Sequence, residues 1–236
     1  MVMTGTPGSE LVFINEAFYA DAVSPAQLDS VLADGWRHFG THFFRYSLNL
    51  YRDEIVRVIP LRIRLADFRV SKSQRRVLRK NEDLAVEFAP IAITDEFESL
   101  FDLHKRRFDH GVPDSIYDFL SNDPARVPTG GFQITARDDG KLLAVSFFDI
   151  GAISVSAIYG CFDPAESGRS LGIFTMLKVI EFALRDGKEF YYHGYAYEGE
   201  SFYDYKKRFS ALESFDWNGN WTAFNAENAE IAEKEL

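Results

Sequence analysis

The sequence predicts an α/β (α+β) fold, in which helices flank a mixed sheet and a smaller α/β region forms the N-terminus. Two observations support this. Strand-like runs alternate with amphipathic helical segments along most of the 236 residues. The composition, 46% hydrophobic and 15% aromatic, provides for a real core and excludes a disordered chain. We expect an N-terminal region over residues 1–83, a second domain over 84–225 and an acidic tail over 226–236.

The N-terminal region contains two helices with recognisable start signals. Ser24 can cap a helix over residues 24–34, in which proline occupies the first helical position. Ser71 or Ser73 can cap the second helix, over residues 71–81. Between the two helices, residues 36–46 are extended and aromatic. Residues 55–65 alternate arginine with aliphatic side chains, which predicts a strand with a basic face.

The rest of the chain repeats strand-like and helix-like segments in a definite order. These are a strand at 84–89, helices at 94–110 and 114–120, strands at 132–137, 141–150 and 152–160, a helix at 168–186, a strand at 190–195, a short helix at 201–209 and a hairpin at 215–224. This order is the layout of the GNAT-like acyltransferase fold. A resemblance at the level of the fold does not by itself give a function.

Charge is distributed unevenly along the chain. The formal net charge is −10, from 36 acidic and 26 basic residues. Residues 57–80 hold nine basic residues and one acid, which gives +8 in that window and −18 in the remainder. An acidic body argues against binding nucleic acid over the whole surface. The basic window predicts a local anion-binding site instead.

Several classes of protein are excluded by what the sequence lacks. Cys161 is the single cysteine, so an intramolecular disulfide framework and a cysteine-cluster metal or iron–sulfur site are excluded. The sequence has no apolar run of 18 residues, and its first ten residues lack the pattern of a signal peptide. We therefore expect a cytoplasmic protein with no membrane partner.

The basic helix at 71–81 is the sharpest signal. Paired arginines near a helix start suit bidentate contacts with phosphate groups. A solvated basic face is the competing interpretation, but the helix follows an arginine-rich strand, which favours one continuous patch. The residues that we expect to bind an anion are Arg69, Ser73, Gln74, Arg75, Arg76, Arg79 and Lys80.

The start of the helix at 168–186 corresponds to a loop of known pattern in GNAT enzymes. There, a (Gln/Arg)-x-x-Gly-x-(Gly/Ala) loop binds the pyrophosphate of acetyl-CoA through its backbone N–H groups. Arg169 and Gly172 fit that pattern, but Phe174 occupies the place of the last small residue. Its ring would obstruct close approach of a phosphate, which argues against acetyl-CoA. A plain helix start is equally compatible, because one glycine loop is weakly specific.

Residues 189–212 contain six of the eleven tyrosines. Buried tyrosine hydroxyls need partners, and aromatic rings can stack on nucleic-acid bases. Ordinary core packing is the alternative for each of them. His193 alone would more often be a structural histidine than a base, and Lys206 alone would belong to a solvated helix face.

Taken together in this order, these segments resemble the aminoacyl-tRNA–protein transferases, which are the arginyltransferases and the bacterial aspartate/glutamate leucyltransferases of the N-degron pathway. The matching segments are FRVSKSQRRVLRKN (68–81), SAIYGCFDP (156–164), SGRSLGIFTMLKVIEFA (167–183) and YYHGYAYEGESFYDYKKRFSALE (191–213). LADGWRHFGTHFFRY (32–46) is similar to the family's Gly-Trp-Arg-Arg-x-Gly segment. The family's cysteine cluster is missing, since residues 47–58 contain no cysteine, so no metal or iron–sulfur cofactor is expected.

The resemblance implies transfer of an amino acid, arginine or leucine, from aminoacyl-tRNA as co-substrate to the N-terminal α-amine of acceptor proteins with acidic N-termini. Arg75, Arg76, Arg79 and Lys80 would hold either the tRNA acceptor stem or an acidic acceptor residue. The other implied roles concern the cavity: Arg169, Ser170 and Gly172 at the terminal phosphate region of the tRNA, Tyr159, Tyr195 and Tyr203 as pocket residues, and Lys206, Tyr205 and His193 as catalytic residues.

Two other functions stay open. One is a non-catalytic GNAT-like binding module that keeps the anion patch to bind N-termini or RNA, which the missing cysteines favour. The other is an acyl-CoA-dependent N-acyltransferase, which Phe174 disfavours.

Overall fold

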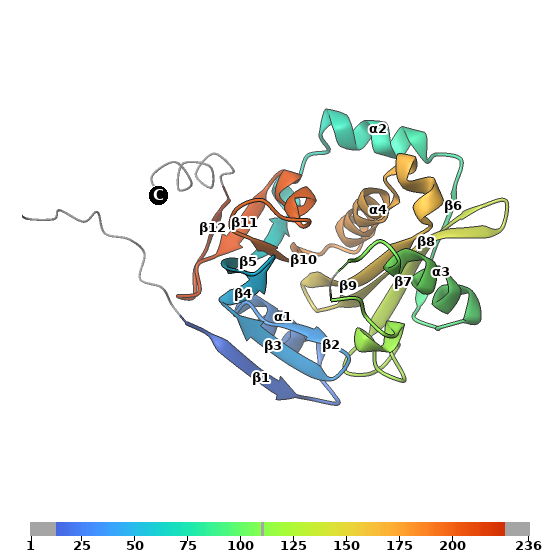
Figure 1. Ribbon diagram of the computed structural model, residues 1–236. Coiled ribbons are helices and arrows are strands. Elements are labelled where there is room, and N and C mark those ends of the chain that lie inside the picture. Colours follow the sequence, from blue (N-terminus) through green and yellow to red (C-terminus); the bar gives the residue numbers. More distant parts are fainter. Residues whose placement is uncertain (1–12, 110, 225–236) are drawn as a thin grey trace, which may run out of the picture.

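The computed structural model describes residues 13–109 and 111–224, which build a large mixed sheet covered by helices and a small sheet beside it (Figure 1). The predicted fold class is thereby confirmed. The acidic tail over 226–236 lies outside the described residues. The small sheet has the order β1-β3-β2 and consists of β1 (Asn15–Tyr19), β2 (Arg37–Phe39) and β3 (His42–Tyr46).

The large sheet has the order β12-β11-β5-β10-β9-β8-β7-β6, and β4 pairs with β5 beside this path. Its strands are β4 (Leu48–Tyr51), β5 (Glu54–Arg64), β6 (Ala85–Pro90), β7 (Gly131–Asp138), β8 (Lys141–Ile150), β9 (Ser154–Phe162), β10 (Phe190–Tyr197), β11 (Leu212–Phe215) and β12 (Trp221–Ala223). β5 comes from the N-terminal third of the chain and lies between β10 and β11. The division at residue 83 stays a prediction.

Four α-helices and four 3-10 turns complete the described chain: α1 (Pro25–Ala33), α2 (Lys72–Lys80), α3 (Asp95–Lys105), α4 (Leu171–Arg185), η1 (Leu65–Asp67), η2 (Ile116–Asp118), η3 (Pro164–Arg169) and η4 (Asp204–Arg208). The helices expected at 114–120 and 201–209 are only the short turns η2 and η4. The helix expected at 94–110 ends already at Lys105.

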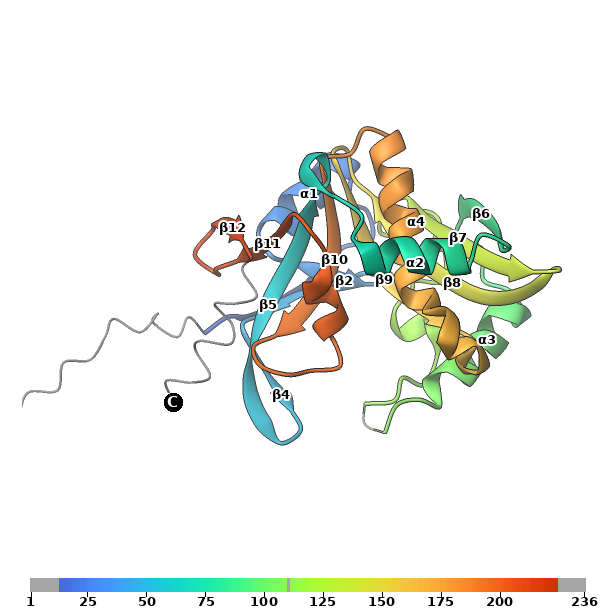
Figure 2. The same cartoon turned by 90° about the horizontal axis from the view of Figure 1, so that it is seen from above.

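α3 and α4 cover opposite faces of the sheet, as the alternation along β8 requires. Val145 and Phe147 pack in the cluster that contains the apolar face of α3. Ala144 and Phe148 point the other way and pack on the side of α4. α2 lies across α4 on its outer side (Figure 2).

On β5, Arg62 is buried and Arg64 is about half exposed, and both are paired with one carboxylate. The Arg62 Nε atom donates to Glu213 at 2.7 Å, and its guanidinium lies 4.0 Å from the centroid of the Phe190 ring, so Arg62 is buried. Arg64 donates to the same carboxylate, from β11. The expected continuous patch of strand and helix is therefore wrong, because β5 lies inside the sheet and Glu213 compensates its charges.

β9 and β10 run parallel, but they pair only from Ser154 to Ser156 against Phe190 to Tyr192. Beyond those pairs the two strands separate. The register of β10 against β5 shifts between Tyr192 and Gly194, where Gly194 has a φ of +102°. A bulge of this kind bends the strand and redirects its side chains. The opening between β9 and β10 leads into the cavity described below.

Candidate functional site

A cavity of about 660 Å³ opens where β9 and β10 separate, and it extends to the first turn of α4. Most of its wall is aromatic. The charged side chains on the wall are Arg37, Arg107 and Lys206, and within the described part of the chain no aspartate or glutamate lines it. The cavity is therefore apolar and cationic.

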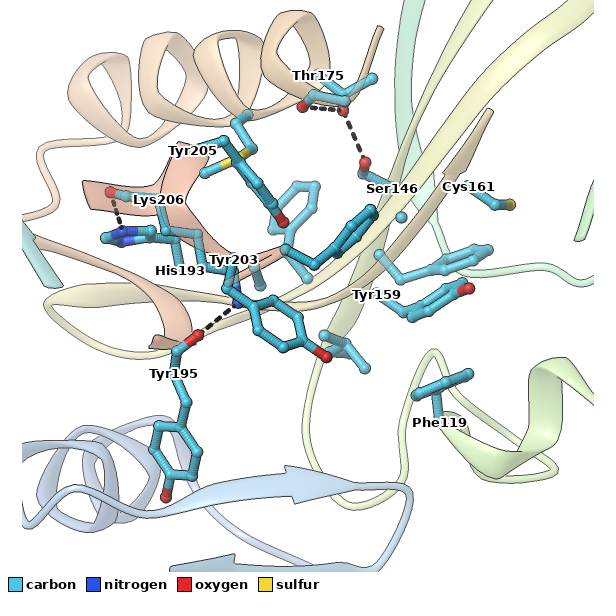
Figure 3. A pocket seen from close by; sticks show the side chains of 18 of the residues that line it. Phe119, Ser146, Tyr159, Cys161, Thr175, His193, Tyr195, Tyr203, Tyr205 and Lys206 are labelled. Atoms are coloured by element: carbon cyan, nitrogen blue, oxygen red, sulfur yellow. Dashed lines mark hydrogen bonds between the residues drawn. The ribbon is translucent and has the colours of Figure 1, made fainter. Parts of the chain in front are cut away.

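The tertiary structure brings most of the expected pocket, catalytic and loop residues to this one cavity. Its lining includes Tyr159, Ser170, Gly172, His193, Tyr195, Tyr203, Tyr205 and Lys206 (Figure 3). They come from β9, β10, the start of α4 and η4, which are far apart in the sequence. Their individual roles stay predictions.

Lys206 is half-buried in the cavity wall. Its Nζ atom donates to the carbonyl oxygen of Tyr195 at 2.9 Å and lies 4.8 Å from the centroid of the Tyr203 ring. Burial, together with the nearby positive charge of Arg37, lowers the pKa of Lys206 to about 7. The ammonium group therefore changes charge near neutral pH.

Arg37, on β2, is the residue that sequence reasoning missed. Its Nη2 atom donates to the carbonyl oxygen of Ala157 at 2.7 Å. Its Nη1 atom is buried and has no hydrogen-bond partner in the described structure. Burial lowers the pKa of this guanidinium. Arg37 lies in the Gly-Trp-Arg segment of the family resemblance, so that segment is the signal that could have found it.

His193 serves the structure around η4. Its Nε2 atom lies 3.2 Å from the carbonyl oxygen of Lys206 (Figure 3). Its ring packs near Tyr191 and Phe209. Burial lowers the pKa of His193 to about 3, so the imidazole is neutral at physiological pH. A proton shuttle through His193 stays a prediction that this burial does not support.

The tyrosines differ in where their hydroxyls point. Tyr195 donates to the carbonyl oxygen of Gly35 at 2.6 Å, so its hydroxyl is held on the side of the small sheet. The Tyr203 and Tyr205 side chains extend into the cavity (Figure 3). Burial raises the pKa of Tyr205 to about 12, so its hydroxyl keeps its proton and can donate it in a hydrogen bond.

The aromatic end of the cavity contains a stacked pair. The rings of Tyr159 and Phe119 are 4.0 Å apart between centroids and 16° from parallel. His104 lies at the edge of this group, and Phe162 N–H donates to its Nδ1 atom at 3.1 Å. Burial lowers the pKa of His104 to about 4. His104 is therefore neutral at neutral pH, and the charge at this end of the cavity is that of Arg107, whose guanidinium lies 4.5 Å from the centroid of the Phe162 ring.

The expected anion-binding residues of α2 divide into two groups. Arg75, Arg76 and Arg79 are exposed, as is the neighbouring Lys72, and no carboxylate within the described residues lies within ion-pair distance of them. Ser71 and Gln74 form a capping box, in which the Ser71 N–H donates to Gln74 Oε1 at 2.9 Å. The Gln74 side chain is buried in this capping box.

The remaining members of the set contact the protein itself, and so does Arg75, whose Nη1 atom donates to the carbonyl oxygen of Val70 at 2.7 Å. Lys80 Nζ donates to the carbonyl oxygen of Gly168 at 2.7 Å, which fastens the end of α2 to the loop before α4. Arg69 Nη1 donates to the carbonyl oxygen of Phe68 at 2.8 Å. The Ser73 hydroxyl lies 2.9 Å from that of Ser71. The basic surface of α2 thus lies directly beside the start of α4.

Arg169 is surrounded by carboxylates. It donates to both oxygens of Asp83, at 3.0 and 2.9 Å, and it lies 3.3 Å from Glu166 and 3.7 Å from Asp138. A phosphate would have to displace these acids. Phosphate binding by Arg169 stays a prediction, and the first N–H groups of α4, which no side chain caps, are the better donors there.

The argument from Phe174 against acyl-CoA is wrong. Phe174 is 1% exposed and packs with Leu143, Ala144 and Leu171 between α4 and the sheet. Its ring therefore points away from the helix start that would receive a phosphate. Only the periodicity of the helix could have revealed this, because residue 174 shares the buried face with Leu177.

Two general observations concern metals and membranes. Among the described residues, no three histidine, cysteine or acidic side chains lie together as metal ligands would. No helix in residues 13–109 and 111–224 has the length and hydropathy to cross a membrane. The absence of a cofactor stays an expectation.

Comparison with known proteins gives consistent results. The family model described as "Arginine-tRNA-protein transferase, C terminus" matches residues 97–216. An aspartate/glutamate leucyltransferase from Xanthomonas euvesicatoria is 34% identical over 175 residues, which cover 68% of this chain and 68% of that protein. One from Stenotrophomonas maltophilia is 33% identical, over 72% of this chain and 70% of its own length. The chain spans about two thirds of the length of these relatives.

A solved structure shares the fold. The C-terminal domain of a putative lysylphosphatidylglycerol synthetase from Agrobacterium fabrum has a TM-score of 0.50 and 16% identity, and the match covers 92% of this chain and 70% of that chain. At this identity the likeness supports the fold alone.

Proposed function

Because the chain belongs to the arginine-tRNA-protein transferase family, whose activity is tRNA-dependent transfer of an amino acid to protein N-termini, we propose that its cavity brings a leucyl ester of tRNA together with an acidic acceptor N-terminus. The relatives are aspartate/glutamate leucyltransferases, a name that indicates a leucyl donor and an acidic acceptor for those proteins. The chemistry of the cavity wall supports each of them independently.

The observation that carries the proposal is a wall with three cations and no carboxylate in the described chain. An arginyl side chain would add a further positive charge beside Arg37 and Lys206 without a partner, which is costly in a desolvated site. A leucyl side chain fits the aromatic surface around Phe119 and Tyr159. The cations in turn favour an acidic acceptor.

The tRNA is bound, in this proposal, by the exposed cations of α2. Lys80 fastens α2 to the start of α4, so a phosphate on α2 lies near the uncapped N–H groups at the mouth of the cavity. The remainder of the chain carries −18 and repels the body of a tRNA. Contact is therefore confined to one end of the tRNA and weakens with salt.

The reaction is aminolysis of an activated ester. The neutral α-amine attacks the ester carbonyl, a peptide bond forms, and the ribose hydroxyl of the tRNA leaves with a proton. An α-amine has a reference pKa of about 7.7–8.0, so on the order of a tenth is neutral at pH 7. Positioning therefore dominates the rate enhancement.

The oxyanion that forms during this attack needs hydrogen-bond donors. The Tyr205 hydroxyl extends into the cavity, and the nearby Lys206 adds positive potential while it is protonated. We propose Tyr205 as the donor and Lys206 as the group that supports it electrostatically.

The proposal is tested with the purified chain, Leu-tRNA or Arg-tRNA, and peptides that begin with Asp, Glu or Ala. We expect mass spectrometry to show addition of one leucyl residue to the Asp and Glu peptides from Leu-tRNA. Transfer from Arg-tRNA alone would overturn the choice of donor. No transfer from any charged tRNA would leave a binding module. Strong thermal stabilisation by acetyl-CoA would favour the acyl-CoA alternative.

A further inference from the structure

Arg37 lies in the cavity wall and has no role in the transfer chemistry proposed above. We infer that Arg37, supported by Lys206, forms a subsite for the side-chain carboxylate of the acceptor's N-terminal residue. This inference rests on the proposed function and assigns its acceptor preference to one residue. Arg37 lies in the Gly-Trp-Arg segment, but the family resemblance assigns no role to it.

The first observation is the position of the two cations. Both lie where the parallel pairing of β9 and β10 has ended. Arg37 binds the carbonyl oxygen of Ala157 on β9, and Lys206 binds that of Tyr195 on β10. These backbone bonds hold each cation by one donor and leave further donors free for a ligand.

The second observation is that the two cations converge on one point. A Cβ atom added to Gly194 would overlap with Arg37 Nη1 and would lie 3.0 Å from Lys206 Nζ. Both nitrogens thus lie against Gly194 and close to each other. The glycine leaves room for the guanidinium there, and its φ of +102° suits no other residue well.

The third observation is the missing counter-charge. Other partly or fully buried arginines have carboxylates: Arg62 binds Glu213, and Arg169 binds Asp83. Asp149 attracts Arg37 only weakly and is bonded to His38 Nε2 at 2.8 Å. Arg37 Nη1 is buried without a partner in the described structure. A bound anion would remove the cost of this uncompensated charge.

The shape of the surroundings favours a carboxylate over a phosphate. Tyr46 and Tyr191 line the cavity close to Arg37, and their bulk favours the smaller, planar anion there. The phosphates of a tRNA have a more accessible site on α2. A carboxylate bound between a guanidinium and an ammonium makes charge-assisted hydrogen bonds, which are stronger than neutral ones.

The test compares acceptor peptides that begin with Asp and with its neutral isostere Asn, using the full chain and one charged tRNA. We expect the wild-type protein to prefer Asp by roughly tenfold to hundredfold in kcat/KM, the range for a hydrogen bond to a charged group. Arg37→Met should lose most of the activity on the Asp peptide and little on the Asn peptide. Arg37→Lys should retain part of the preference.

Arg45→Met is the matched control, because Arg45 is paired with Glu16 on the small sheet, at 2.7 Å, and does not line the cavity. It should leave the Asp/Asn ratio unchanged. Equal wild-type rates on the Asp and Asn peptides would overturn the inference, whatever the variants do. Equal losses on both peptides in Arg37→Met would assign Arg37 to the tRNA end and would overturn it too.

Thermal stabilisation by the acceptor peptide alone separates this inference from the proposed function. We expect the Asp peptide, and not the Asn peptide, to raise the Tm of the wild-type protein, and Arg37→Met to abolish the difference. If the wild-type chain transfers no amino acid, this binding difference still supports the subsite. Equal shifts from both peptides would count against it.

Discussion

Arg62 and Arg37 are both arginines inside the fold, but only Arg62 has a carboxylate partner. Arg62 donates to Glu213 and lies over aromatic rings, so it stabilises the junction of β5 and β11. Arg37 has one backbone acceptor and one buried, unpartnered nitrogen. A protein retains such an uncompensated cation at a cost, and binding an anion is the function that explains it here.

At the scale of the residue, Gly194→Ala should impair transfer to acidic acceptors. The added Cβ would displace Arg37 Nη1, and the positive φ would add strain of about 1 kcal/mol or more. Gly219→Ala is the control, because Gly219 has a similar φ of +97° and no atom within 4 Å of an added Cβ.

Urea denaturation and kcat/KM on the Asp peptide measure the two effects. Both variants should lose stability through backbone strain, but only Gly194→Ala should lose most of its activity. Equal activity in the two alanine variants would show that the space beside Gly194 has no role in acceptor binding.

At the scale of the element, α2 is a basic helix joined to the start of α4. Its capping box at Ser71 and Gln74 fixes where it begins, and Lys80 fixes where it ends. The exposed cations between them form no ion pairs with described carboxylates, so their removal takes no salt bridge from the fold. The helix is therefore a surface whose charge can be changed without unfolding the protein.

Replacing Arg75 and Arg76 by alanine should reduce transfer about tenfold or more at low salt and flatten its salt dependence, because two phosphate contacts are lost. The Tm should stay close to that of the wild type. Arg126→Ala removes an 84% exposed side-chain cation elsewhere and should change neither property. Unchanged transfer by the double variant would remove α2 from the proposed tRNA contact.

At the scale of the whole molecule, two neutral histidines are enclosed in the fold. Burial lowers the pKa of His104 to about 4 and that of His193 to about 3, whereas an unfolded histidine has a pKa of 6.5. As the pH falls below 6.5, the unfolded state gains protons that the folded state does not. The free energy of unfolding should therefore fall between pH 6.5 and 4.

The contribution of His104 by pH 4 is on the order of 3 kcal/mol. Urea denaturation at a series of pH values measures it. His104→Asn keeps an acceptor for the Phe162 N–H and removes the titrating ring, so its stability should fall less steeply over that range. An equally steep fall in this variant would exclude His104 as a source of the acid sensitivity.

Much of the fold follows from local patterns. The capping serines at 24 and 71, the amphipathic period of α4 and the alternation in β7, β8 and β9 each predict an element near its observed position. The short turns η2 and η4 were expected as longer helices. A segment this short can form either an α-helix or a 3-10 turn, and tertiary contacts decide between the two.

The candidate site was predicted only in part. Lys206 and the tyrosines belong to one dense segment that the family resemblance marks, so the sequence pointed to them. Arg37 binds Ala157, which is 120 residues away, and nothing in its own segment indicates that contact. The orientation of Phe174 likewise depends on which face of α4 meets the sheet.

The sequence by itself determined most of the elements, the family and the cluster of basic residues on an acidic body, because periodicity, motifs and charge can be read along the chain. The tertiary structure decided which cations are available to a ligand. Glu213 neutralises Arg62 across 151 residues, whereas Arg37 reaches the cavity without such a partner. Ion pairing depends on distances between residues remote in sequence, and only the folded chain sets those distances.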